Sequence, residues 1–371
     1  MSKKPADLGT LLALTKTTQT LLTRYQSSLS PASTSPPPTT GDIPNPLDVI
    51  KATTTLLKSH TTTLSLLLLT PPLTPSAIIS KLSDVSAGPL SGMVAAASCT
   101  TVEGQKGDIG DTMRTEVRAQ VRRLLGSWSE VLACVVGMAE RRQKEGKNGD
   151  DGVTQSEAEK QQVLSATGVV WEACDALIKL CDDGVVGLVV RKAQEYRAVL
   201  LDAVEELKEW GEDVEDEDEG GVEGSSDEDE IFGASNKLGK DDKELKALLD
   251  TSVKKLKMVG MLYQALIKRR LKTYPASSIA ESTAAATNGT ATASPSRILD
   301  DLMVRLKSIP EMVDDVAGAF YDLDEEEARR TLGKCYSEAK CVAELVRYNW
   351  SNADDEFTAW SGKWVSALDT M

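Results

Sequence analysis

Residues 186–230 read VGLVVRKAQEYRAVLLDAVEELKEWGEDVEDEDEGGVEGSSDEDE. In the first half, apolar and small residues recur at steps of three and four, which is the period of an amphipathic α-helix. These residues are Val186, Val189, Ala193, Tyr196, Leu200, Val204 and Leu207. The second half, from Glu212 to Glu230, holds twelve carboxylates and no basic residue. Because its few apolar side chains cannot offset the entropy lost on ordering, we expect this acidic tract to be a disordered linker after a helix.

The helical period recurs along most of the remaining chain. Similar stripes lie within residues 47–68, 117–138, 164–181, 245–266, 299–320 and 328–346. No segment alternates apolar and polar residues for more than a few positions, as a half-buried strand would. Aromatic residues make up only 4% of the chain, which favours helix packing over a sheet sandwich. The sequence therefore predicts an all-α protein.

Prolines and changes of composition mark the ends of the predicted helices. Residues 31–40 include three consecutive prolines and form a stiff linker between the first and second helices. Pro71, Pro72 and Pro75 end the second helix, because proline cannot donate a backbone hydrogen bond. Pro310 falls inside a helical stripe, where we expect a kink or the start of a new helix.

The chain, at 371 residues, is longer than one hydrophobic core usually serves. We expect two antiparallel helical bundles joined by the acidic linker. The parts are a first helix with a proline-rich linker at 1–44, an N-terminal bundle at 45–211, the linker at 212–240, and a C-terminal bundle at 241–371 with a flexible insert at 275–295.

The sequence offers no clear catalytic or metal-binding pattern. His60 is the only histidine, and no nucleophile pattern surrounds it. Zinc needs several nitrogen or sulfur ligands at suitable spacing, which one histidine and scattered cysteines do not supply. Cys174 and Cys181 share a helical face, where core packing is the simpler interpretation. We expect a non-enzymatic protein that uses no cofactor.

Cysteine usage and hydropathy point to an intracellular protein. None of the six cysteines forms a Cys-x-x-Cys pair, so reduced thiols are favoured over disulfides. No secretory signal is visible, and the longest apolar run, Leu66 to Leu69, is far shorter than the roughly 20 residues that span a bilayer. We expect a soluble protein with no membrane partner.

Basic residues are concentrated just after the acidic tract. Residues 240–272 hold ten Lys or Arg against four Asp or Glu, with clusters at 254–257 and 268–272. Cations in a last helical turn complement the helix dipole, which explains the second cluster without a partner. A nuclear-import signal or a phosphate-binding surface is the alternative. Direct binding to nucleic acid is disfavoured, because the acidic tract would compete for the same cations.

The acidic tract itself has two interpretations. It is a solvated spacer, or it is a ligand for basic surfaces whose contacts would be weak and salt-sensitive. Ser225 and Ser226 precede a run of four acidic residues and are candidates for acid-directed phosphorylation.

Four stretches in order carry a family resemblance. They are Thr61-Thr-Thr-Leu64 with a leucine run and Pro71-Pro72-Leu-Thr-Pro75; Val170-Trp171-Glu-Ala-Cys174; the acidic tract ahead of a lysine-rich helix; and Ile309-Pro310-Glu-Met-Val313-Asp314-Asp315-Val316 running to Phe320-Tyr321. Between about residues 45 and 350 the chain thus resembles the cyclin-D-binding protein family, the cyclin-D-interacting helical proteins. The proline-rich residues 31–46 and the tail with its tryptophans at 350, 360 and 364 lie outside this pattern.

The resemblance implies a two-domain helical protein that acts through protein–protein contacts in cell-cycle control, in cytoplasm and nucleus. Its partners would be cyclins or helix-loop-helix regulators. The helix at 245–266 is the candidate for pairing with a partner helix, although Ser252 and Arg270 make it a poor zipper. The predicted partner-binding residues are Leu245, Leu249, Leu256, Val259, Tyr263 and Leu266.

Two other functions are compatible with the same composition. A helical scaffold of the vinculin type would bind cytoskeletal partners. An acidic chaperone would bind basic nuclear proteins through the tract at 212–230.

Overall fold

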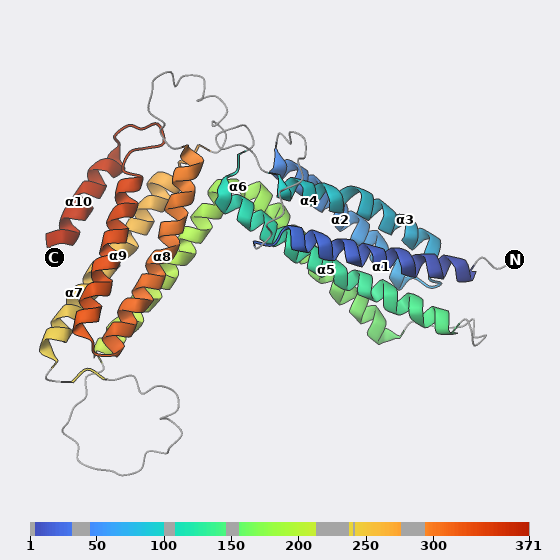
Figure 1. Ribbon diagram of the computed structural model, residues 1–371, viewed down its shortest axis with the longest axis horizontal. Coiled ribbons are helices and arrows are strands. Elements are labelled where there is room, and N and C mark those ends of the chain that lie inside the picture. Colours follow the sequence, from blue (N-terminus) through green and yellow to red (C-terminus); the bar gives the residue numbers. More distant parts are fainter. Residues whose placement is uncertain are drawn as a thin grey trace, which may run out of the picture. The chain divides into compact units, whose positions relative to one another are not determined.

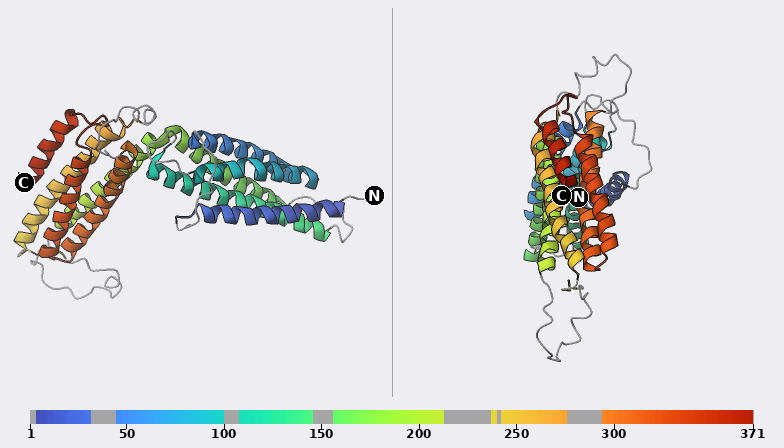
Figure 2. Two further views of the ribbon diagram at one scale, coloured as in Figure 1. Left: turned by 45° about the horizontal axis from the view of Figure 1, so that its top comes forward. Right: turned by 90° about the vertical axis from the view of Figure 1, so that its left-hand side faces the viewer.

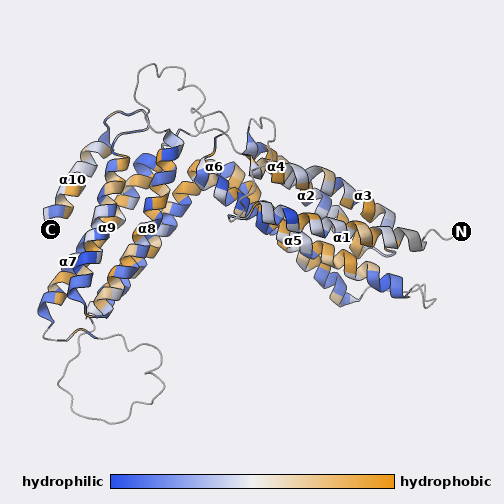
Figure 3. Cartoon of the chain, viewed as in Figure 1, coloured by the Kyte–Doolittle hydropathy of each residue, from blue (hydrophilic) through white to orange (hydrophobic). Residues whose placement is uncertain are grey.

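The computed structural model describes residues 4–31, 45–99, 108–145, 156–212, 237–239, 242–275 and 294–370 (Figure 1). Within these ranges every regular element is helical and no β-strand is formed, so the predicted all-α class is confirmed. The acidic residues 213–236, with Ser225 and Ser226, and most of the predicted insert at 275–295 lie outside the described residues. Figure 3 shows polar and apolar residues alternating along the helices, as amphipathic packing requires.

The chain forms two compact units, residues 1–185 and 186–371. The division falls inside the long helix α6, Glu157–Glu212, at a break where Gly184 has φ 61° and ψ −165°. Glycine adopts this conformation without the steric penalty that a Cβ would bring. The predicted boundary at residue 211 thus differs from the observed division, because the helix before the acidic tract belongs to the second unit.

Contacts between α6 and α7, Lys243–Leu266, explain this assignment. Arg197 donates a hydrogen bond to the Gly260 carbonyl at 3.0 Å, and Lys257 pairs with Glu205 at 3.3 Å. At Gly260 the helices approach so closely that a Cβ would lie 2.8 Å from the Leu201 side chain. The acidic tract therefore connects two neighbouring helices of one bundle, rather than two bundles.

The first unit packs five helical segments around an apolar core. They are α1 (Lys4–Ser28), α2 (Pro46–Leu69), the run of α3 (Pro75–Val85), η1 (Ser86–Leu90) and α4 (Ser91–Ser98), α5 (Gly110–Glu145), and the first part of α6. In the core, the Trp128 indole donates a hydrogen bond to the Thr61 hydroxyl at 3.0 Å. Thr61 in turn donates to the Leu57 carbonyl at 2.8 Å, so the buried polar atoms of α5 and α2 satisfy one another.

Prolines act differently at two places in this unit. Pro71 and Pro72 separate α2 from α3, as predicted. Pro89 instead lies within η1, a π-helical turn that passes directly into α4. Because proline lacks the N–H that an α-helix would use, a local widening of the helix accommodates it.

The second unit is an up-and-down bundle of the last part of α6 with α7, α8 (Pro295–Tyr321) and α9 (Glu325–Leu345). A further helix, α10 (Glu356–Thr370), packs against α7 and α9. The two views of Figure 2 show these helices running alongside one another. Trp210 and Tyr321 meet edge to face, with ring centroids 5.3 Å apart, and join α6 to α8.

Helix α8 continues through Pro310, so the expected restart does not occur. The missing proline N–H leaves the Leu306 carbonyl, four residues earlier, without its usual helical donor. The buried hydroxyl of Tyr263 on α7 donates to this carbonyl at 2.5 Å. A tyrosine from a neighbouring helix thus replaces the hydrogen bond that the proline removes, and the helix is maintained.

Candidate functional site

The six predicted partner-binding residues of α7 lie in the core of the second unit. Leu245 is 4% exposed, and the other five are at most 1% exposed. The expectation of a free apolar face is corrected here, because α6, α8 and α9 already cover this stripe. A partner helix would reach these side chains only if the bundle opened.

Two of the four basic residues at 268–272, Arg269 and Arg270, make contacts within the protein. Arg270 is 1% exposed and pairs with both oxygens of Asp355, at 2.7 and 2.9 Å. Its remaining donors reach the carbonyls of Arg269, Val346 and Arg347, so all five N–H groups are bonded. These hydrogen bonds hold the pKa of Asp355 down at about 2.

This arginine fixes the tryptophan-bearing tail, whose role the sequence left open. The Phe357 ring lies 4.4 Å from the Arg270 guanidinium, and the Trp350 indole donates to the Arg270 carbonyl at 2.9 Å. The Trp364 indole donates to the Met258 carbonyl of α7, also at 2.9 Å. Arg269 pairs with Glu356 at the start of α10. Arg269 and Arg270 therefore anchor α10, whereas Lys268 and Lys272 are exposed, and a nuclear-import signal in this cluster stays a prediction.

The structure places the candidate reactive residues apart. Burial raises the pKa of both the Cys174 and Cys181 thiols to about 12, which keeps them protonated and weakly nucleophilic. His60 lies on the partly exposed side of α2. Among the described residues, no group of three or more His, Cys, Asp or Glu is placed to hold a metal ion. No helix in the described ranges is long and apolar enough to cross a membrane.

Helices α2 and α6 pack side by side in opposite directions, and charged pairs mark their seam. Lys58 contacts Asp175 at 2.5 Å, and Lys51 contacts Asp182. Further along, the hydroxyls of Ser65 and Thr167 lie 3.0 Å apart. The residues that meet sum to 232 or 233, so one antiparallel register holds along the seam. Polar contacts fix this register, as in other helix pairs with charged edges.

Three exposed apolar side chains surround the level of Thr167 on this seam. Leu66 is 60% exposed, Leu164 is 50% exposed, and Trp171 is 39% exposed. Leu164 and Trp171 belong to the side of α6 that also carries Asp175, since steps of seven and four residues stay on one face. We call Leu66, Leu164 and Trp171 the α2/α6 patch. Within the described chain, the Trp171 indole N–H has no hydrogen-bond partner.

The apolar stripe predicted within residues 164–181 begins at Leu164 and includes Trp171, and the structure corrects the burial expected of these two side chains. The buried stripe of α6 runs through Val163, Val170 and Leu177, one position away. Both stripes have the helical period, so spacing alone does not separate them. Polar residues of α2, which include Lys58, lie opposite the edge of α6 that carries Leu164 and Trp171. These polar residues were the signal in the sequence that distinguishes the exposed stripe of α6 from the buried one.

The fold and the geometry of the α2/α6 patch can now be compared with known proteins. Residues 48–213 match the family model described as Grap2 and cyclin-D-interacting, N-terminal. These residues are thus similar to the N-terminal domain of that family. The predicted resemblance is confirmed over these residues, which carry the whole α2/α6 patch. The matched region extends past Gly184 into the second unit, so the family match and the first compact unit end at different places.

One curated relative matches a similar share of the chain. A protein of Schizosaccharomyces pombe, described as uncharacterized, is 24% identical over 204 residues. The matched region is 54% of this chain and 53% of the yeast protein. The chain thus spans about half the length of the curated relative that it matches.

Proposed function

We propose that this chain is a non-enzymatic adaptor of the cyclin-D-interacting type, acting through protein–protein contacts in cell-cycle control. The family description supports a protein partner, with a D-type cyclin as the first candidate. A helix-loop-helix regulator, which the sequence resemblance implies, is the second candidate. The protein would act in cytoplasm and nucleus. Phosphorylation of Ser225 and Ser226 in the acidic tract stays a prediction.

The exposed Trp171 side chain is the observation that supports this proposal best. Tryptophan is enriched among the residues that contribute most to protein interfaces, and a free indole N–H offers a directional hydrogen bond. Leu66 and Leu164 extend the apolar area along the seam. We therefore assign the partner contact to the α2/α6 patch and no longer to α7.

The α2/α6 patch fits an amphipathic helix of the partner. The apolar residues of the partner helix, at positions i, i+3 or i+4, and i+7, would pack against the α2/α6 patch. Charges at the edge, such as Lys58 and Asp175, would orient the bound helix while contributing little affinity.

Binding of a purified D-type cyclin to the full chain tests the proposal by titration calorimetry. Trp171→Ala is expected to weaken binding at least about tenfold, as loss of an interface anchor does. The control is Tyr348→Ala, which removes an exposed aromatic side chain of the second unit and should leave affinity unchanged. Equal affinity of both variants and the unchanged chain would refute the assignment to this patch. A chain that binds neither a D-type cyclin nor a helix-loop-helix protein would refute the proposed function.

A further inference from the structure

The first unit contains a hollow of about 740 Å³ between α1 and α5, outside the surface assigned to partner helices. Its lining is polar and combines two arginines with hydroxyl and amide side chains. The residues are Thr23, Gln26, Ser27, Ser30, Ala119, Arg122 and Arg123. We call this hollow the α1/α5 pocket. Its α1 side lies before residue 48, where the family match begins.

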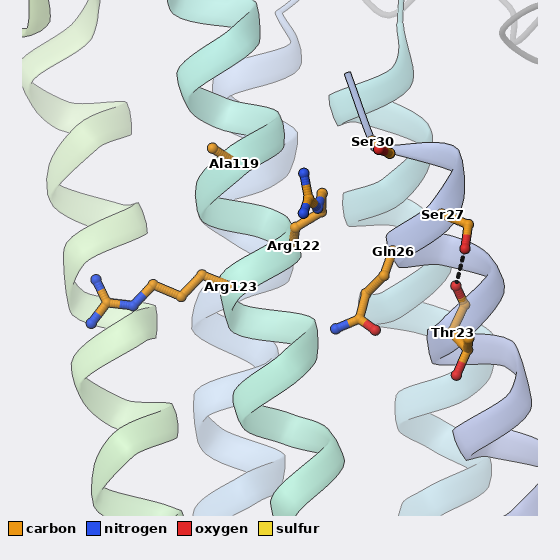
Figure 4. Close-up of a pocket in the computed structure, with 7 residues that line it drawn as sticks. All are labelled: Thr23, Gln26, Ser27, Ser30, Ala119, Arg122 and Arg123. Atoms are coloured by element: carbon orange, nitrogen blue, oxygen red, sulfur yellow. Dashed lines mark hydrogen bonds between the residues drawn. The ribbon is translucent and has the colours of Figure 1, made fainter. Parts of the chain in front are cut away.

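Figure 4 shows how the donors of the α1/α5 pocket are arranged. The Gln26 side chain extends from α1 toward α5, and the Arg122 guanidinium stands between the two helices, near the level of Ser30. Arg123 points away from α1 and contacts Glu172 of α6 at 3.4 Å. Arg122 is thus the guanidinium available to this pocket.

The polar groups that line the α1/α5 pocket differ in whether they already donate a hydrogen bond within the protein. The Thr23 and Ser27 hydroxyls donate to the backbone carbonyls one turn earlier. The Arg122 guanidinium, the Gln26 amide and the Ser30 hydroxyl bond to no other side chain or carbonyl in the described part of the chain. Three donors, from α1, the turn after it and α5, therefore line one hollow, and none of them has an acceptor within the described part of the chain.

The local charge is positive although the chain as a whole carries −15. Residues 8–31, which cover most of α1 and the turn after it, contain no Asp or Glu, and neither do residues 117–129 of α5, which Glu116 and Glu130 flank. The same segments carry Lys16, Arg24, Arg118, Arg122 and Arg123, of which Lys16 pairs with Glu140 and Arg123 pairs with Glu172 of α6. Arg118 uses its Nε–H on the Ala97 carbonyl, and burial and the neighbouring Arg114 lower its pKa. An anion would relieve this uncompensated charge.

We propose that the α1/α5 pocket binds a phosphomonoester dianion through Arg122, Gln26 and Ser30. A phosphomonoester presents three terminal oxygens and about two negative charges, which matches three donors that approach from different sides. Arginine binds two of these oxygens at once, because its planar N–H groups fit the geometry of phosphate. The volume also accommodates part of the group that carries the phosphate. A phosphorylated serine of a protein segment and a free phosphate share this chemistry.

The test is an NMR titration of the full chain with inorganic phosphate and, separately, with a blocked Gly-phosphoserine-Gly tripeptide. The reporters are the Gln26 side-chain amide and the backbone amide of Gly126. Gly126 lies next to this side chain, since a Cβ added at Gly126 would be 3.3 Å from the Gln26 amide nitrogen. Arg122→Gln is expected to weaken binding at least tenfold. Arg142→Gln is the matched control, because it removes the same charge from α5 about 30 Å away, at 1.5 Å per residue, and should not alter binding.

Each result has a defined meaning. Saturable shifts that Arg122→Gln abolishes and Arg142→Gln preserves support the pocket. Tighter binding of the tripeptide than of phosphate indicates a protein-borne ligand, and equal binding indicates the free anion. Identical titrations of all three proteins, or no saturable shift in the unchanged chain, would overturn the proposal. Circular dichroism confirms that Arg122→Gln folds, and the cyclin test at Trp171 is independent of every outcome.

Discussion

Replacing Tyr263 by phenylalanine tests whether this tyrosine compensates for Pro310. The Tyr263 ring is fully buried, and its hydroxyl donates to the Leu306 carbonyl at 2.5 Å. Tyr263→Phe keeps the ring but leaves that carbonyl without a donor, since Pro310 has no N–H. An unsatisfied buried acceptor costs about 1–3 kcal/mol, and we expect this loss in the second unit.

The same substitution should cost less when position 310 can donate. In a Pro310→Ala background the new N–H reaches the Leu306 carbonyl in the ordinary helical way. Tyr263→Phe then removes only a second hydrogen bond, with a net contribution of about 0.5–1.5 kcal/mol. The two substitutions should therefore couple by about 1 kcal/mol. The volume lost at position 310 is common to both members of the comparison and cancels.

Native-state hydrogen exchange of α7 and α8 amides is the suitable assay, because two units need not unfold in one transition. Each 1.4 kcal/mol appears as a tenfold change in exchange rate when exchange reports the opening equilibrium. Four proteins complete the cycle: the unchanged chain, the two single variants and the double variant. An equal cost of Tyr263→Phe in both backgrounds would refute the idea that the tyrosine replaces a missing helical donor.

Three further predictions concern stability. Thr61→Val should cost about 1–3 kcal/mol, measured by hydrogen exchange of α2 and α5 amides, because it leaves the buried indole N–H of α5 without an acceptor. Thr54→Val removes a buried hydroxyl that has no hydrogen-bond partner within the described chain, so it should be neutral or stabilising. Equal effects of the two substitutions would contradict this prediction. Gly260→Ala should destabilise the second unit by about 1–3 kcal/mol, because the new Cβ would clash with a leucine of α6. Gly318→Ala has open space around the new Cβ and should stabilise the unit by about 0.5–1 kcal/mol. The urea midpoints of the two variants should therefore move in opposite directions. The pKa of Asp355 is depressed, so the anchoring of α10 should persist above about pH 4 and be lost as pH falls toward about 2. Tryptophan fluorescence should change in this pH window, and the change should vanish in Asp355→Asn. A change that persists in this variant would exclude the Asp355 carboxylate as its cause.

The helices were predictable because the apolar period is long and repeated. Pro71 and Pro72 marked a helix end correctly. Neither residue has the backbone N–H that would continue α2, and the chain leaves the helix before α3 begins. Pro310 misled the same reasoning, because a tyrosine 47 positions earlier supplies the lost hydrogen bond. Such compensation depends on tertiary contacts and has no local signature.

The candidate site was less predictable than the fold. An apolar stripe says that a helix face is buried, but not whether it is covered by its own chain or by another. The α7 stripe that suggested a partner is covered from within, whereas Trp171, taken as core, is exposed. The cations at the end of α7 looked like a free cluster, yet Arg270 is bonded to backbone and carboxylate groups 76 to 85 residues away. Distances of this kind are set by the packing of whole helices.

The break at Gly184 determines how this protein can be divided for experiments. A fragment cut at residue 213, where the family match ends, would retain the last turns of α6 without the helices that cover them. Val189, Leu200 and Val204, all buried in the intact chain, would then face water and promote aggregation. The complementary fragment would lack one wall of its own interior. Cutting at Gly184 instead leaves each fragment with all the helices that cover its apolar side chains. Fragments divided at this glycine should therefore be more soluble than fragments divided at residue 213.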